Sequence, residues 1–209
     1  MQYNLLTINL ILARVWLMAE TTKIYQLKVA LKHIKPPVWR RFQVRSDVKL
    51  TKLHEVIQIV MGWSNYHLYE FEAGRTSYAD RKLWDEDWEY SDMSDAGKAM
   101  LQDVLPDVGS KCLYTYDMGD GWEHTIVLEE ILDPVPGEKY PICITGKHNC
   151  PPEDCGGPWG YEELLKILTD PSHEDYEEMK EWVGEEYDPN RFDCLEVNLD
   201  LPRRTVVKE

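Results

Sequence analysis

Three cysteines and a histidine are concentrated in one irregular stretch of the chain. Cys143, Cys150 and Cys155 are separated by six and four residues, and His148 lies among them. Thiolate and imidazole groups are the usual ligands of Zn²⁺, and this ion often organises loops with several thiols. Zinc knuckles and ribbons normally contain cysteine pairs separated by two residues, and no such pair occurs here. The stretch therefore predicts either a zinc site, completed by His148 or His124, or thiols in a rigid turn.

Histidine and carboxylate side chains form a second candidate site. Acid–base catalysis and metal-assisted hydrolysis both require such groups to converge in one cleft, with pKa values set by burial and neighbouring charges. The alternative is structural, because an inward-facing imidazole is usually hydrogen-bonded to a backbone carbonyl and an aspartate beside glycine usually forms a turn. The candidate ligand-binding residues are His67, Asp117, Asp120, Trp122, Glu153, Asp154 and Trp159.

A basic stretch offers a third kind of chemistry, which is binding to phosphate groups. Residues 21–60 contain nine basic and two acidic side chains, whereas residues 61–209 contain 13 and 35. The segment Trp39–Lys52 could lie along a nucleic-acid backbone, through these candidates: Trp39, Arg40, Arg41 and Arg45. The net charge of -15 opposes this interpretation, because it repels the same polymer. The basic side chains could instead pair with the acidic segment 174–188, within one molecule or across a dimer, or form a solvated face.

Strands that could position these residues are indicated by alternating apolar and polar residues. The predicted strands are 25–32, 38–45, 66–72, 112–117 and 122–130. The last two form a hairpin around the glycine-containing turn 118–121. Period-two counting places His67 on one strand face with Tyr69 and Phe71, and it turns His124 inward on the face of Trp122.

Helices are indicated by apolar residues at helical spacing. Thr51 is predicted to cap a helix that Gly62 ends, and Ser172 to cap another that buries Tyr176, Met179 and Trp182 or Val183. Shorter helices are predicted near 100–105 and over 161–168, with loops over Asp80–Asp95 and Tyr140–Gly160. Together these elements predict one α+β domain: a mostly antiparallel sheet with about four helices packed on one side.

The ends of the chain are predicted to lie outside this domain. Residues 1–20 contain an apolar run that is too short to span a bilayer, and the first basic residue, Arg14, follows the run. We therefore expect an upstream-start artefact or a loosely attached leader, with Met18 as the functional start, and a docked helix as the alternative. The domain is expected over 21–201 and a polar tail over 202–209. Without an export signal, the expected location is the cytoplasm, and the five cysteines are expected to be thiols or metal ligands.

Four ordered motifs give the chain a resemblance to a known family. They lie at 36–41, 53–68, 116–124 and 150–161, and include PPVWRR, MGWSNYHL, YDMGDGWEH and CPPEDCGGPWGY. With these motifs the chain resembles the plasmid pRiA4b ORF-3-like family over about residues 23–199. The resemblance implies a compact α+β fold found in bacteria and archaea, with members on chromosomes and on mobile elements. It implies no known reaction, and Met118 is an apolar replacement of the usual phenylalanine.

The absence of several motifs narrows the function. The sequence contains no P-loop, no strand-linked dinucleotide-binding glycines, no serine-hydrolase elbow and no zincin motif. We therefore expect a binding or adaptor module for a protein or small molecule, with no membrane contact. Its site would comprise the Cys143–Tyr161 loop, the Asp117–His124 hairpin and His67. The alternatives are a zinc-dependent hydrolase that uses the same residues and a nucleic-acid accessory protein of mobile elements that uses Trp39–Lys52.

Overall fold

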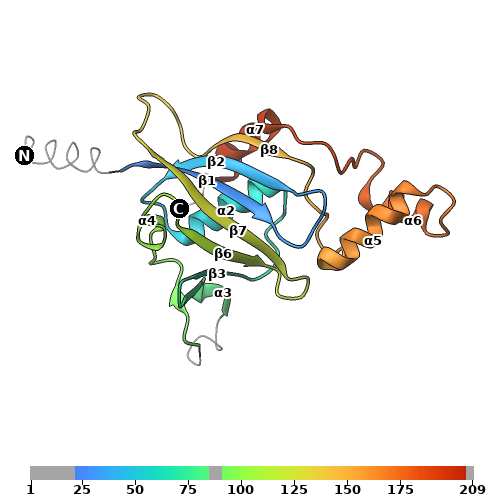
Figure 1. The fold of residues 1–209 in the computed structure, drawn as a ribbon, viewed down its shortest axis with the longest axis horizontal. Coiled ribbons are helices and arrows are strands. Elements are labelled where there is room, and N and C mark those ends of the chain that lie inside the picture. The colour runs from blue at the N-terminus through green and yellow to red at the C-terminus, as the bar shows by residue number, and fades with distance from the viewer. Residues whose placement is uncertain (1–21, 85–90, 206–209) are drawn as a thin grey trace, which may run out of the picture.

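The structure is a computed structural model that describes residues 22–84 and 91–205. Its centre is an eight-stranded sheet in the order β5-β4-β3-β6-β7-β1-β2-β8 (Figure 1). The strands are β1 (Ile24–Leu31), β2 (Trp39–Arg45), β3 (Tyr69–Ala73), β4 (Thr76–Ala79), β5 (Ser94–Asp95), β6 (Lys111–Tyr116), β7 (Trp122–Leu132) and β8 (Ile142–Lys147). Neighbouring strands are antiparallel except β4 and β5. The predicted α+β class is confirmed, with more strands than the sequence indicated.

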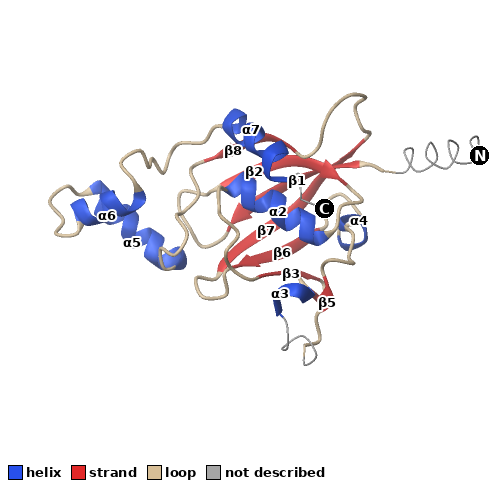
Figure 2. Ribbon diagram, turned by 180° about the vertical axis from the view of Figure 1, so that it is seen from behind, coloured by secondary structure: helices blue, strands red, loops and turns tan. Residues whose placement is uncertain are grey.

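Within the described residues, six helices accompany the sheet, where the sequence predicts about four. They are α2 (Leu50–Met61), α3 (Arg81–Trp84), α4 (Leu101–Val104), α5 (Gly157–Thr169), α6 (Tyr176–Val183) and α7 (Cys194–Thr205). Figure 2 shows α2 lying across one face of the sheet, and α7 contacts both α2 and β8. Helices α5 and α6 pack against each other and extend beyond one end of the sheet. These two helices depart from the predicted single layer.

The hydrophobic core lies between α2 and the inner face of the sheet. Alternate side chains of β1 point into it, so that Leu27 and Val29 are fully buried while Gln26 and Lys28 are not. The α2 residues at helical spacing face them: Leu53, Val56, Ile57 and Val60 are all inaccessible to solvent. The two periodicities that predicted these elements thus mark their buried faces.

Helix α2 begins earlier than predicted, and helix α6 begins later. Helix α2 begins directly after Lys49, which makes no side-chain capping hydrogen bond, and the predicted cap Thr51 is its second residue. The predicted cap Ser172 lies in a turn, where its hydroxyl donates to the Asp170 carboxylate at 2.6 Å, and α6 begins only after Asp175. The Ser172 prediction was wrong because a short polar side chain can take a local turn partner in place of a capping role. The Thr51 prediction was wrong because the helix begins one residue before it.

Three predicted segments have different boundaries. The predicted strand 66–72 begins only at Tyr69, so His67 lies in the segment that leads into β3. The predicted loop Tyr140–Gly160 contains β8, which pairs with β2, and the first turn of α5. The predicted loop Asp80–Asp95 contains α3 and β5, and its residues 85–90 lie outside the described part of the chain. Pairing with distant strands fixes these short elements, and local periodicity does not report such pairing.

Of the two predicted domain boundaries, the structure can be compared only with the C-terminal one. Helix α7, which the sequence did not predict, continues to Thr205 and crosses the expected boundary between 21–201 and 202–209. The expected leader, residues 1–20, lies outside the described residues. None of the helices in the described ranges combines the length and apolar character needed to cross a membrane.

Candidate functional site

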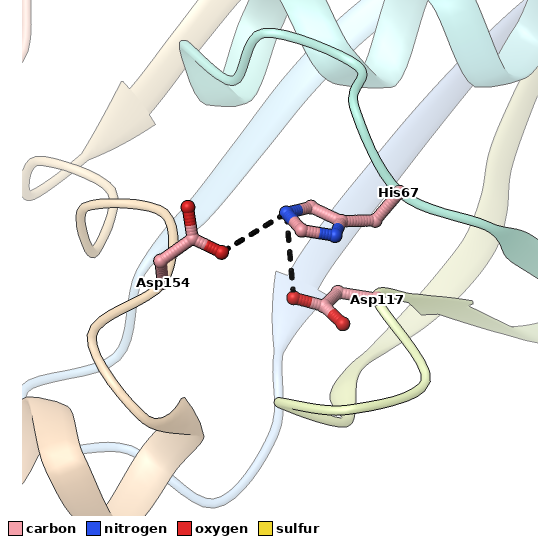
Figure 3. Close-up of side chains that lie close together, drawn as sticks. All are labelled: His67, Asp117 and Asp154. Atoms are coloured by element: carbon pink, nitrogen blue, oxygen red, sulfur yellow. Dashed lines mark ion pairs between the residues drawn. The ribbon is translucent and has the colours of Figure 1, made fainter.

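Three potential metal ligands from distant parts of the chain meet at one end of the sheet (Figure 3). They are His67 before β3, Asp117 after β6, and Asp154 in the loop between β8 and α5. The Nε2 atom of His67 lies 3.1 Å from an oxygen of Asp154 and 3.6 Å from an oxygen of Asp117. One ligand atom from each residue fits within a 4.8 Å cluster. Among the described residues this is the one such group of three or more histidine, cysteine or acidic side chains.

The hairpin turn holds Asp117 in a fixed orientation. Its backbone is left-handed, with φ of 58°, and the side chain is nearly buried. One carboxylate oxygen accepts hydrogen bonds from the backbone N–H groups of Gly119 and Asp120, at 2.9 and 3.3 Å. The backbone N–H of Asp117 donates to the carbonyl of Leu68 at 2.9 Å, which ties the turn to the segment of His67. The second carboxylate oxygen therefore faces the imidazole.

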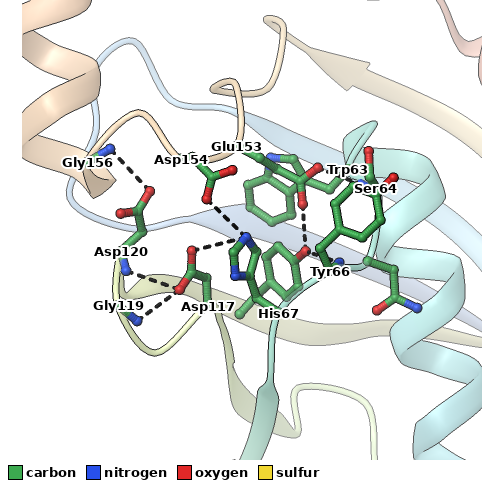
Figure 4. A network of polar contacts seen from close by, with 12 residues as sticks. Trp63, Ser64, Tyr66, His67, Asp117, Gly119, Asp120, Glu153, Asp154 and Gly156 are labelled. Carbon is green, nitrogen blue, oxygen red and sulfur yellow. Dashed lines mark hydrogen bonds and ion pairs between the residues drawn. The ribbon is translucent and has the colours of Figure 1, made fainter.

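The ring of Tyr116 packs against that of His67, within the network of polar contacts drawn in Figure 4. The two rings meet edge to face, with centroids 5.7 Å apart. The Tyr116 hydroxyl accepts a hydrogen bond from the backbone N–H of Tyr66 and donates one to Glu153 at 2.6 Å. Glu153 also accepts a hydrogen bond from the backbone N–H of Ser64. Burial, followed by the contact with Glu153, raises the pKa of Tyr116, so its hydroxyl keeps the proton for this bond.

The loop that carries Asp154 is docked onto both neighbouring segments. Trp63, which is 2% exposed, donates its indole N–H to the carbonyl of Pro151 at 2.9 Å. Asp120 accepts a hydrogen bond from the backbone N–H of Gly156. At Gly157 a Cβ atom would lie 2.3 Å from the carbonyl oxygen of Asp120, so the close approach requires glycine. The carboxylate of Asp154 points toward His67, although 70% of the side chain is exposed.

A cavity of about 250 Å³ adjoins His67. Its lining residues are Thr51, His54, Glu55, Asn65, Tyr66, His67, Leu68, Tyr69, Asp80 and Leu83. Within it, His54 contacts the Tyr114 hydroxyl at 2.7 Å and the side-chain oxygen of Asn65 at 2.5 Å. Burial lowers the pKa of His54 to about 4, so this imidazole is neutral at physiological pH.

The cysteines do not join this cluster. Cys143 and Cys150 are buried, and burial raises the pKa of Cys143 and of Cys155 to about 12. His148, the fourth predicted ligand, contacts the carbonyl of Pro37 at 3.0 Å through Nδ1. Within the described ranges, no group of three ligand atoms inside 4.8 Å includes a thiol. The thiols therefore lie in the structure as protonated, mostly buried side chains.

His124 is part of the core. It is fully buried, and its Nδ1 lies 3.2 Å from the carbonyl of Tyr114 while its ring meets Trp63 edge to face. Burial lowers its pKa to about 4. The inward orientation predicted for His124 and Trp122 is confirmed, since Trp122 is 1% exposed. Neither side chain reaches the cluster, which contains His67, Asp117 and Asp154.

The remaining predicted site residues have separate surroundings. Asp120 and Glu153 bind backbone N–H groups that hold the cluster together, as described above. Trp159 is 82% exposed on the first turn of α5 and lines different cavities, with His33 and Pro158. The sequence interpretation missed Tyr116 as a positioning residue. Its place at the end of a predicted strand, directly before Asp117, was the available signal.

The predicted basic surface is divided between the two faces of β2. Arg40 is 2% exposed, stacks on Phe192 and donates to the carbonyls of Val60, Trp39 and Lys147. Arg41, on the other face, forms a two-point ion pair with Glu129, and Arg45 does so with Asp47. Arg40 and Arg41 point to opposite faces of the sheet, because successive strand residues alternate in direction. The charges of Arg41 and Arg45 are paired with local carboxylates, whereas Arg40 is held by backbone carbonyls.

Comparisons with known proteins agree with this fold. The chain is 43% identical over 177 residues to "Uncharacterized protein y4hQ" of Sinorhizobium fredii, covering 84% of this chain and 89% of the relative. It also resembles the crystal structure of a protein of unknown function, MM3350, from Methanosarcina mazei Go1. That similarity has a TM-score of 0.76 and 39% identity, and covers 84% of this chain and 97% of the other. The family model for plasmid pRiA4b ORF-3-like proteins matches residues 23–196. The chain therefore belongs to the plasmid pRiA4b ORF-3-like family.

Proposed function

We propose that this protein is a metal-dependent binding module that holds one divalent ion between His67, Asp117 and Asp154. The observation that carries the proposal is the convergence of two carboxylates on the Nε2 atom of His67. This atom is buried and makes no hydrogen bond, although carboxylate oxygens lie 3.1 and 3.6 Å away. An oxygen at 3.1 Å that makes no hydrogen bond lies off the axis of the nitrogen lone pair. An ion on that axis, flanked by both carboxylates, accounts for this arrangement.

The spacing of the ligand atoms supports this proposal. Nitrogen and oxygen ligands at about 2.0–2.2 Å from one ion lie about 2.8–3.1 Å apart at the right angles of an octahedron and about 3.3–3.6 Å apart in a tetrahedron. The observed separations of 3.1 and 3.6 Å lie within these values. The hydrogen bonds from Gly119 and Asp120 to Asp117 are the outer contacts that typically orient a ligating carboxylate.

The donor set favours a first-row transition metal. One imidazole nitrogen with two carboxylate oxygens suits Zn²⁺, Mn²⁺ or Fe²⁺ better than Ca²⁺, which prefers six to eight oxygen ligands. Two aspartates also neutralise the charge of a divalent ion. Such an ion would fasten the segment before β3, the hairpin turn and the Asp154 loop to one another. Its role would then be to hold a recognition surface in shape.

Metal-dependent hydrolysis is the second candidate. Three protein ligands leave coordination positions for water, and a bound ion lowers the pKa of that water. The exposed Asp154 and the cavity beside His67 would give a substrate access. Glu153 is a poor general base, because both of its oxygens already accept hydrogen bonds, whereas Glu55 and Asp80 line the cavity. The binding module ranks first because it requires the bound ion and no general base.

The proposal is tested by metal stoichiometry. Untagged, chelator-treated protein is titrated with Zn²⁺ and with Mn²⁺ and weighed by native mass spectrometry. We expect one ion per chain, and no stoichiometric ion in the Asp117→Asn/Asp154→Asn double variant. The matched control, Asp107→Asn/Asp133→Asn, removes the same charge from exposed positions and should bind as the wild type does. An ion retained by the first double variant contradicts the proposal.

The second candidate has its own test. Hydrolysis of p-nitrophenyl phosphate or p-nitrophenyl acetate that requires the bound ion would favour the metal-dependent hydrolase over the binding module.

A further inference from the structure

Helices α5 and α6 form a hairpin whose apolar side is incompletely covered. The hairpin extends beyond the end of the sheet (Figure 1). The predicted burial of α6 holds only in part, because Met179 and Val183 pack against the core but no residue of the helix is fully buried. Met179 and Val183 are only half-buried, and Trp182 is 47% exposed. Met179, Trp182 and Val183 thus give one side of α6 a partly open apolar surface, opposite a charged face.

A cleft of about 410 Å³ lies along this hairpin. Apolar side chains from both helices line it: Leu164 and Ile167 from α5, and Met179 and Trp182 from α6. The remaining lining residues include Asp154, Glu163 and Cys155. The cleft therefore has an apolar floor with carboxylates among its lining residues.

The charge around the cleft is strongly negative. Residues 161–188 contain eleven acidic and two basic side chains. Lys166, one of the two basic residues, already pairs with Glu162 and Glu163. The surface therefore repels nucleic acid and anionic lipid. It attracts cationic groups.

We propose that this cleft docks a basic amphipathic helix of a partner protein. Apolar side chains spaced along one face of such a helix would insert between Met179, Trp182 and the α5 side chains. Flanking lysine or arginine residues would contact the acidic rim. This is the usual way in which a helix occupies a groove, with apolar anchors giving affinity and charge giving selectivity and a fast encounter. The proposal does not depend on the metal site, although Asp154 adjoins both.

The test uses a synthetic 14-residue peptide of leucine and lysine, arranged so that leucine occupies one helical face. A second peptide has the same composition in an order that mixes the two residues around the helix, and a third has glutamate in place of lysine. Binding to the full chain is measured by fluorescence anisotropy, with and without added Zn²⁺. We expect the segregated peptide to bind about tenfold more tightly than the mixed peptide, and the acidic peptide not to bind.

Variants locate the peptide on the protein. Trp182→Ala removes an exposed anchor without opening the core and should weaken binding about tenfold. Trp159→Ala removes an exposed tryptophan of α5 that does not line this cleft, and should leave affinity unchanged. Equal binding of the segregated and mixed peptides would overturn the proposal, because it would indicate nonspecific charge attraction. Full affinity in Trp182→Ala would overturn it as well. Binding that persists without Zn²⁺ separates this proposal from that of the metal site.

Discussion

Replacing His67 with alanine is expected to weaken Zn²⁺ binding by about a hundredfold or more. The change removes the nitrogen ligand from the cluster, and two carboxylates without it form a weak site for a transition metal. The side chain is partly exposed and its packing is confined to an edge contact with Tyr116, so we expect the fold to survive. Affinity is measured by competition with a fluorescent chelator, and folding by circular dichroism.

The matched control for this variant is His33→Ala. His33 is an exposed histidine on another turn, 3.4 Å from Glu123, and it takes no part in the cluster. Its loss should leave Zn²⁺ affinity unchanged. If His67→Ala bound Zn²⁺ as tightly as the wild type, the three residues would be a simple ion-pair cluster. The function proposed for this protein would then be wrong.

Acidification is expected to destabilise the fold through two buried histidines. Burial lowers the pKa of His54 and of His124 to about 4, from an ordinary value of 6.5. Between these values the unfolded chain binds more protons than the folded one, so stability is full above pH 6.5 and is lost as the pH falls toward 4. Each group corresponds to a loss of about 3 kcal/mol across this window.

Urea unfolding at a series of pH values measures this effect. The His54→Gln and His124→Gln variants start from a lower stability, because each disturbs a packed site. The informative quantity is the slope of the unfolding free energy against pH, which should fall by a similar amount in each variant and further in the double variant. His33→Gln, at an exposed position, should retain the slope of the wild type. An unchanged slope in the double variant would show that other groups govern acid unfolding.

The central elements of the fold could be predicted because their patterns are local. In β1 and α2 the apolar residues alone mark the buried face, and the glycines of the turn 118–121 mark the hairpin. Helix α7 was not predicted, although Cys194, Val197 and Leu201 stand at helical spacing and pack against the core. It is also held by contacts with α2 and β8. In this helix, the Asn198 side chain forms two hydrogen bonds with the backbone of Cys143, which lies 55 positions earlier in the chain. Such contacts leave no signal in a local window.

The members of the candidate site could be predicted, but their grouping could not. His67, Asp117 and Asp154 all belong to the residues singled out by type. They meet because β6 pairs with β3 and because the Gly156–Gly157 segment docks on Asp120. Spacing along the chain favoured the cysteine loop instead, since its four ligand-type residues are close in sequence. In that loop the residues are close in sequence, but their ligand atoms do not gather into a cluster like that of His67, Asp117 and Asp154.

The most direct test of the metal site is X-ray absorption spectroscopy at the zinc edge, on protein loaded with one equivalent of Zn²⁺. The site proposed here predicts a shell of nitrogen and oxygen atoms at about 2.0–2.1 Å, with outer scattering from one imidazole ring and without sulfur. The outer imidazole signal should vanish in His67→Ala. A sulfur shell at about 2.3 Å would contradict the account, because it would place the ion among Cys143, Cys150 and Cys155.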